Sequence, residues 1–306
     1  MFDVHTLLQQ LINGLVHGGM YALIALGYTM VYGIIELINF AHGDVYAMGS
    51  FFSIAILALL PIGTITSGPL LVLIAIVVIL LAALLCGTLG VLIERLAYRR
   101  LRNAPRLAPL ITAIGVSLIL ENIMQLWKGP SEVPFPQFLP NTQHVVAGIS
   151  FYNYDILVVT VSVICMIALN RFVYGTKLGR AMRATAQDRD AAQLMGINVN
   201  STIAWTFFIG SALAGVAGFV SGMYYGTTFF LNGYQAGLKA FTAAVLGGIG
   251  NITGAMLGGF VIGMVEALST QFLGDQWSEV VVFSILVVVL VLRPSGLLGE
   301  QLPEKV

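Results

Sequence analysis

The chain has 306 residues, of which 58% are hydrophobic and 9% charged, with 14 basic residues against 14 acidic ones. An ordinary soluble domain carries about 25% charged residues, so a soluble globular protein is excluded. The balanced charge gives no reason to expect nucleic-acid binding. The apolar residues form long blocks, each near the length of about 20 residues that a helix needs to cross a bilayer. This pattern predicts an all-α, polytopic transmembrane helical bundle, with residues 1–306 forming one domain.

Eight apolar blocks follow one another along the chain. They cover residues 11–32, 33–60, 70–93, 108–127, 155–174, 202–226, 240–268 and 277–292. The residues before the first block include no Lys or Arg, so they lack the basic region of a signal peptide, and we expect this block to be retained. Cys86 and Cys165 both fall inside blocks, where we expect small buried hydrophobic side chains.

Blocks two and seven are longer than one crossing needs, and both contain Gly and polar residues. Asn39, His42 and Asp44 interrupt block two, and Gly250 and Asn251 interrupt block seven. Helix breaks at membrane depth are tolerated where protein or a water-filled cavity surrounds them. Breaks at matching places in two halves are typical of internal repeats around a path. We predict that both blocks are broken or re-entrant, with both termini cytoplasmic. The polar residues either line a path or stabilise the break.

Basic residues set the orientation of the loops. Five lie in residues 94–107 and five more in residues 171–200. Cationic loops stay in the cytoplasm, so both segments are predicted to be cytoplasmic. Residues 128–153, between blocks four and five, then lie outside. Their four prolines predict a structured extracytoplasmic loop (Pro130, Pro134, Pro136 and Pro140).

Three ionisable side chains fall within or beside the later blocks. Glu121 lies inside block four and Glu266 late in block seven, and such groups are costly in a membrane. Each could pair across the bundle, contact a partner subunit or approach a path. Lys239 opens block seven, where it either reaches to the interface or marks the outer mouth.

Glycines four residues apart predict close contacts between helices. They form three groups: Gly14 and Gly18; Gly218, Gly222 and Gly226; and Gly250, Gly254 and Gly258.

Motifs of catalysis and nucleotide binding are absent from the sequence. The four histidines are widely spaced, and neither HExxH nor GxxxxGK[ST] occurs. We therefore expect no catalytic residue, no metal site and no cofactor. If the chain takes part in ATP-driven transport, another chain must supply the ATPase.

The second basic loop, residues 175–200, contains a helix-forming segment. Alanines are frequent between Arg180 and Ala192, Arg180 and Arg183 are spaced to share one face, and Gly196 is a plausible stop. The pattern predicts one short amphipathic helix on the cytoplasmic face. Within it, "DAAQLMG" resembles the acidic–Ala–Ala–x3–Gly signature in the coupling helix of ABC importer permeases, with Asp in place of Glu. The resemblance implies an ATPase-coupling role for Arg180, Arg183, Asp190, Ala191, Ala192 and Gly196.

The resemblance extends over most of the chain. It is carried by "GGMYALIALGYTMVYGIIELINFAHGDVYAMGSF", "IERLAYRRLR", "LGRAMRATAQDRDAAQLMGIN" and "KAFTAAVLGGIGNITGAMLGG". These stretches closely resemble the H-type permeases of branched-chain amino-acid ABC importers. The resemblance implies alternating-access import of aliphatic amino acids across the bacterial inner membrane. It also implies a second related permease, two cytoplasmic ATPases and a periplasmic substrate-binding protein as partners.

Two other functions are compatible with the residues. A related ABC importer could carry urea or short amides. A stand-alone channel or secondary transporter could use Asp44, Glu121 or Glu266 as proton carriers, although the cytoplasmic helix argues against a protein with no ATPase to bind.

Overall fold

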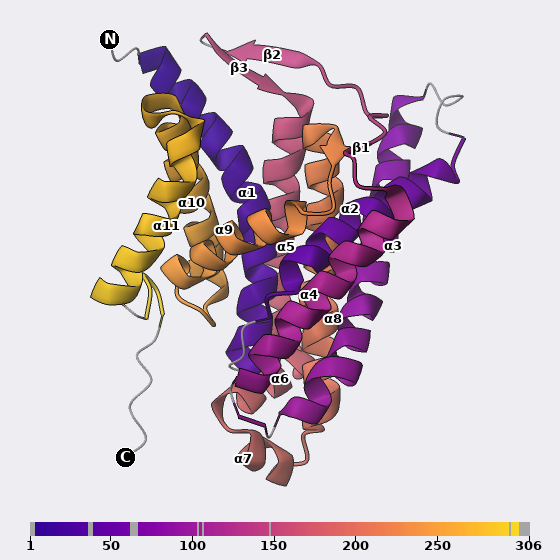
Figure 1. The fold of residues 1–306 in the computed structure, drawn as a ribbon, viewed down its shortest axis with the longest axis vertical. Coiled ribbons are helices and arrows are strands. Elements are labelled where there is room, and N and C mark those ends of the chain that lie inside the picture. The colour runs from indigo at the N-terminus through magenta and orange to yellow at the C-terminus, as the bar shows by residue number, and fades with distance from the viewer. Residues whose placement is uncertain are drawn as a thin grey trace.

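The computed structural model describes residues 4–35, 39–61, 67–102, 104–105, 107–146, 148–293 and 295–299, which are mostly helical (Figure 1). The helices are α1 (Val4–Ile35), α2 (His42–Ala58), α3 (Gly68–Ile93), α4 (Leu107–Lys128), α5 (Asn153–Gly175), α6 (Lys177–Gln187), α7 (Arg189–Leu194), α8 (Val199–Tyr225), α9 (Asn232–Gly247), α10 (Ile252–Leu273) and α11 (Asp275–Leu292). A π-helical turn, η2 (Glu94–Tyr98), and a 3-10 turn, η3 (Arg99–Leu101), extend α3. The strands are β1 (Val133–Pro134), β2 (Gln143–Val146), β3 (Ile149–Tyr152) and β4 (Thr227–Thr228).

Seven of the described helices are long and apolar enough to cross a membrane: α1, α3 with its extension, α4, α5, α8, α10 and α11. The spans of α1 and α8 are mostly buried in the bundle, whereas α11 is mostly exposed. The predicted polytopic helical bundle is confirmed. Helices α2 and α9 have 17 and 16 residues. At 1.5 Å per residue each covers only about 25 Å, so neither crosses the membrane as a helix alone.

Both predicted helix breaks are present. Helix α1 ends at Ile35 and α2 begins at His42, whose backbone N–H donates to the Asn39 carbonyl at 3.0 Å. In block seven, α9 ends at Gly247 and α10 begins at Ile252. The turn between them includes Gly250 with a φ of 96°, a conformation that glycine adopts without a steric penalty.

The two halves of the bundle are related as an inverted repeat. Helix α1 begins beside the β2–β3 hairpin, whereas α8 begins at the opposite end of the molecule beside α7 (Figure 1). Helix α1 packs extensively on α10, and α8 packs in the same way on α3. The short helices α2 and α9 pack against each other, with Gly43 of one against Gly233 of the other. Helices α1–α4 therefore correspond to α8–α11.

This correspondence corrects the pairing of the two breaks. The place where the chain passes from α1 to α2 is equivalent to the place where it passes from α8 to α9, and not to the turn before α10. The first half of α9, "NGYQAGLK", is too polar to extend an apolar block. The predicted block seven therefore combined the second half of α9 with α10 in one segment. As a result, the prediction missed one passage of the chain through the bundle.

The two ends of the described chain lie on opposite sides, so the prediction of two cytoplasmic termini is wrong. Near the start of α1, the Gln9 side chain donates to the Ser150 carbonyl in β3 at 2.8 Å. After α11, the Leu297 backbone N–H donates to the Leu246 carbonyl at the end of α9. With the short helices α2 and α9 counted as passages, nine passages lie between the two ends of the described chain (α1, α2, α3, α4, α5, α8, α9, α10 and α11). Because this number is odd, the ends lie on opposite sides.

The loop at residues 128–153 is structured, as its prolines predict. Strands β2 and β3 form an antiparallel hairpin with Gln143 opposite Tyr152, and β1 pairs with β4. Phe135 is buried, and its ring packs edge-on against Phe219 of α8. The loop is thereby fixed to the end of α8.

The glycines spaced four apart have two different roles. A Cβ atom on Gly14 or Gly18 would lie 2.7 or 2.6 Å from backbone Cα atoms of α10, so these glycines do permit close helix packing. Gly226 and Gly250 instead have φ values of 70° and 96° and lie at helix ends. For these two the prediction of helix packing is wrong, because spacing alone does not distinguish a packing glycine from a turn glycine.

Candidate functional site

The polar residues of block two lie at the start of α2 and are buried inside the bundle. The Tyr98 hydroxyl of η2 donates to Asn39 Oδ1 at 2.8 Å, and the Ser117 hydroxyl of α4 donates to Asp44 Oδ2. Asp44 lies in the first turn of α2, where the helix dipole favours a carboxylate. Asn39 and Asp44 thus connect the start of this short helix to η2 and α4.

His42 is also buried, with only 1% of its surface exposed, and it faces α1. Its ring contacts the edge of Tyr28 at a centroid distance of 4.8 Å, and Gly27 leaves room for the Nε2 atom. Neither ring nitrogen makes a well-formed hydrogen bond, although the Ile24 backbone lies close enough to interact. His42 therefore packs between α1 and α2 as a largely unsatisfied polar group.

Glu121 of α4 lies beside the polar residues at the start of α2. It follows Ser117 by one helical turn, is partly buried, and lies close enough to Asp44 for the two carboxylates to interact. The Oδ1 atom of Asp44 has no hydrogen-bond partner within the described structure. Among the described residues, no group of three or more His, Cys, Asp or Glu side chains is arranged to hold a metal ion.

Glu266 pairs with Lys239 across the bundle. The Lys239 Nζ of α9 lies 2.6 Å from Glu266 Oε1 of α10 and 3.8 Å from Glu279 Oε1 of α11. The first two side chains are mostly buried, with 14% and 12% of their surfaces exposed. Lys239 therefore connects three helices rather than extending freely to the interface.

Gly250 and Asn251 form the turn between α9 and α10, apart from the residues at the start of α2. Asn251 Oδ1 accepts from the Gly254 backbone at 2.9 Å, and its Nδ2 donates to the Leu298 carbonyl at 2.9 Å. Gly250 lies against Gly33 of α1, whereas His42 lies against Gly27. Six residues separate Gly27 from Gly33, about 240° around the helix, so α1 stands between the two groups.

The predicted single helix of the 175–200 loop is two helices, α6 and α7, and that detail of the prediction is wrong. Asp188 separates them in an extended conformation with φ −157° and ψ 115°. Its Oδ1 atom accepts from the backbone N–H groups of Asp190 and Ala191, both at 2.9 Å, and so caps α7. Asp188 is thus both the C-cap residue of α6 and the capping residue of α7, the first through its backbone and the second through its side chain.

The residues expected to couple to an ATPase divide into inward and outward sets. Arg183 donates to the Val173 carbonyl and lies over the Tyr174 ring at 4.9 Å, and Ala192 is buried. The outward set is exposed and comprises Arg180, Asp190, Ala191 and Gly196. Arg183 and Ala192 are thus placed to hold the loop on the bundle, and the others are available to a partner.

Three further residues of this loop were not singled out from the sequence. Leu194 and Met195 are 88% and 83% exposed at the end of α7, and form an apolar tip. Arg189 donates to the Ile34 and Ile35 carbonyls at 3.1 and 2.8 Å. The apolar pair before Gly196 was a visible signal. The sequence around Arg189 contained no such signal. The carbonyls that it binds are available only because α1 ends there, and the last carbonyls of a helix have no partner within it.

Comparison with known proteins places this architecture. The family described as branched-chain amino acid transport system, permease component, matches residues 10–290. The chain belongs to this family. It is a multi-pass membrane protein and a permease component rather than an enzyme.

The bacterial relatives of the permease match nearly its whole length, and an archaeal one matches two thirds of it. It is 46% identical over 310 residues to the high-affinity branched-chain amino acid transport system permease protein BraD of Pseudomonas aeruginosa, with all of both chains covered. It is 46% identical over 304 residues to LivH of Escherichia coli K12, which carries the same description, with 98% of this chain and 97% of that one covered. The probable branched-chain amino acid transport permease protein LivH of Methanocaldococcus jannaschii is 31% identical over 215 residues, with 67% of this chain and 63% of that one covered. No solved structure matches the permease.

Proposed function

We propose that this permease is a transmembrane subunit of an ABC importer that moves branched-chain amino acids into the cytoplasm across the bacterial inner membrane. The observation that carries the proposal is 46% identity over the full length of relatives with that description. The inverted repeat with two short internal helices supports a transport role, because such folds place a path between their halves.

The proposed partners are a second related permease, two cytoplasmic ATPases and a periplasmic substrate-binding protein. The chain contains no P-loop, so ATP hydrolysis belongs to other subunits, and we expect the permease to need no cofactor. The apolar tip, Leu194 and Met195, fits the role of an anchor in an ATPase groove, since exposed apolar groups of this kind mark interaction sites. Asp190 and Ala191 lie next to the tip and are also exposed.

The contacts of α6 and α7 suggest how motion would pass into the bundle. Arg189 fastens α7 to the end of α1, and Arg183 fastens α6 to α5. Arg183 and Gly250 also line one cavity of about 80 Å³ together with Gly33 of α1. Closure of the ATPases would therefore displace α1 and the α9–α10 turn together, which is the kind of rigid-body step that alternating access requires.

Uptake by the reconstituted importer tests the proposed function. Vesicles that contain this permease, the second related permease and the two ATPases should take up leucine when the binding protein and ATP are supplied. An ATPase variant that binds but does not hydrolyse ATP should abolish uptake. Persistent uptake would instead favour a channel or secondary transporter. Competition by urea or acetamide, without competition by isoleucine or valine, would contradict the proposed substrate.

Substitution at the apolar tip tests the proposed ATPase contact. We expect Leu194→Asp with Met195→Asp to weaken ATPase association by roughly tenfold or more, since buried anchors at interfaces contribute above about 1.4 kcal/mol. Both side chains are exposed, so the isolated permease should keep its thermal stability. Arg180→Asp serves as the comparison for charge on the outward face. Unchanged co-purification of the ATPases with the double variant would show that the contact lies elsewhere.

A further inference from the structure

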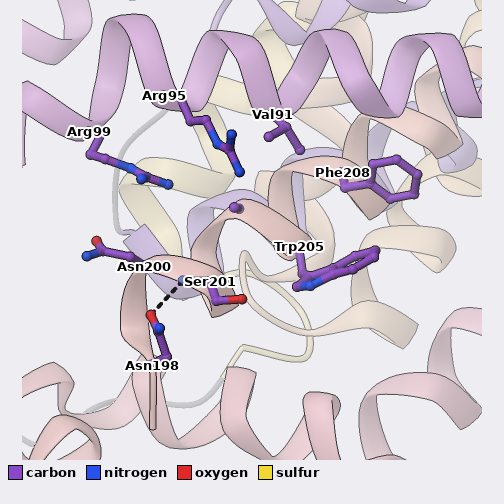
Figure 2. A pocket seen from close by; sticks show the side chains of 9 residues that line it. Val91, Arg95, Arg99, Asn198, Asn200, Ser201, Trp205 and Phe208 are labelled. Carbon is purple, nitrogen blue, oxygen red and sulfur yellow. Dashed lines mark hydrogen bonds between the residues drawn. The ribbon is translucent and has the colours of Figure 1, made fainter.

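A cavity of about 410 Å³ lies where the end of α3 passes the start of α8. Figure 2 shows Val91 of α3, Arg95 of η2 and Arg99 of η3 extending toward the start of α8. The other wall is formed by Asn198, Asn200, Ser201, Ala204, Trp205 and Phe208. The proposed transport cycle assigns no role to this cavity.

The cavity carries an excess of positive charge. Glu94, whose side chain is fully buried, is shared by Arg99 at 2.8 Å and by Arg102. Within the described part of the chain, Arg95 has no ion-pair or hydrogen-bond partner, and its side chain enters the cavity. Glu94 is therefore shared by two guanidinium groups while that of Arg95 has no counter-charge, and an anion in the cavity would balance the excess.

Arg102, which pairs with Glu94 beside the cavity, has a lowered pKa, mainly because it is buried. Burial lowers this pKa below its usual value, and although Glu94 opposes the shift, Arg99 and Arg189 lower it further. The cavity also lies at the amino end of α8, where the helix dipole adds to the favourable potential for an anion.

The surroundings of the cavity are those of a membrane interface. Leu92 and Leu96, on either side of Arg95 along the helix, are 53% and 74% exposed. Trp205 is 47% exposed and packs edge-on against Phe208 at a centroid distance of 5.4 Å. Tryptophan is enriched where hydrocarbon meets headgroups. An anion that enters here would therefore have apolar surface beside it, which suits an attached acyl chain and offers nothing to a free phosphate.

We propose that this cavity binds the phosphate-bearing headgroup of an anionic phospholipid of the cytoplasmic leaflet, held by Arg95 and Arg99, with its glycerol and acyl region against Trp205 and Phe208. Basic groups beside a membrane attract such lipids. The bound lipid would join the end of α3 to the start of α8, directly after the α6–α7 loop. The proposal does not depend on the solute that the permease carries.

Lipid binding by the purified full-length permease tests the proposal. Native mass spectrometry with added phosphatidylglycerol should show bound lipid at lower concentrations than with phosphatidylcholine of the same acyl chains. Arg95→Gln should weaken phosphatidylglycerol binding roughly fivefold, the effect of one basic group near a membrane surface. Arg95→Lys should retain most of the binding. Arg100→Gln is the matched control, because Arg100 is an exposed cation of the adjoining turn η3 that does not line the cavity.

Three outcomes would overturn the proposal. Equal phosphatidylglycerol binding by Arg95→Gln and Arg100→Gln would place the lipid elsewhere. Equal binding of phosphatidylcholine would show that the negative headgroup is not recognised. Inorganic phosphate that displaces the lipid at low millimolar concentration, with an affinity that depends on Arg95, would identify a site for soluble phosphate. A melting temperature equal to that of the unchanged permease is required of each variant, and Arg95 is exposed enough for this to be expected.

Discussion

Lys239 and Glu266 form a buried ion pair. The free-energy cost of burying each charge is offset only by the opposite charge of its partner. The two charged groups lie 2.6 Å apart with little exposure. We expect Lys239→Met to lower the free energy of unfolding by about 3 kcal/mol, because it leaves Glu266 as an unpaired buried charge near Glu279. Thermal unfolding in detergent measures the change. The double variant Lys239→Met with Glu266→Met should recover most of the loss, since it removes both charges.

Lys128→Met is the control for this pair, because Lys128 is an exposed lysine at the end of α4 and its loss should change stability little. A double variant no more stable than Lys239→Met alone would mean that the pair is not the source of the loss.

At the scale of the element, Asp188 determines the shape of the segment that contains α6 and α7. Asp188→Ala removes the acceptor for the first N–H groups of α7, and losing such a cap costs about 1 kcal/mol. We expect α7 to fray while the bundle stays folded, so ATP-driven uptake should fall more than thermal stability does. Asp188→Asn keeps a capping oxygen and should retain uptake. Equal uptake by the two variants would show that the order of α7 does not matter for coupling.

At the scale of the whole molecule, the sequence predicted the class of fold because the apolar blocks are long. The breaks in blocks two and seven and the structured loop after α4 were also predicted from glycine, proline and polar residues. The first half of α9 was missed because Gly233, Gly237 and Ala240 are buried against protein, where an apolar run is not needed. The partners of Glu94 and Arg189 lie on other elements or depend on where a helix ends, and a linear pattern contains neither fact.

The inverted repeat predicts that the start of α1 and the tip of α7 lie on opposite sides of the membrane. In a background of Cys86→Ser and Cys165→Ser, a cysteine at Val4 should react with a membrane-impermeant maleimide in intact cells, as should a cysteine at His144 in the hairpin. Both positions are exposed, and the start of α1, which Val4 begins, is hydrogen-bonded to β3 of the hairpin. A cysteine at Leu194 should react only after the cells are permeabilised. The physical reason is that five passages, through α1, α2, α3, α4 and α5, separate Val4 from Leu194. This number is odd only if the discontinuous passage through α2 completes a crossing that its short helix cannot span alone. Labelling of positions 4 and 194 from the same side would remove one of these passages and with it the equivalence of the two halves.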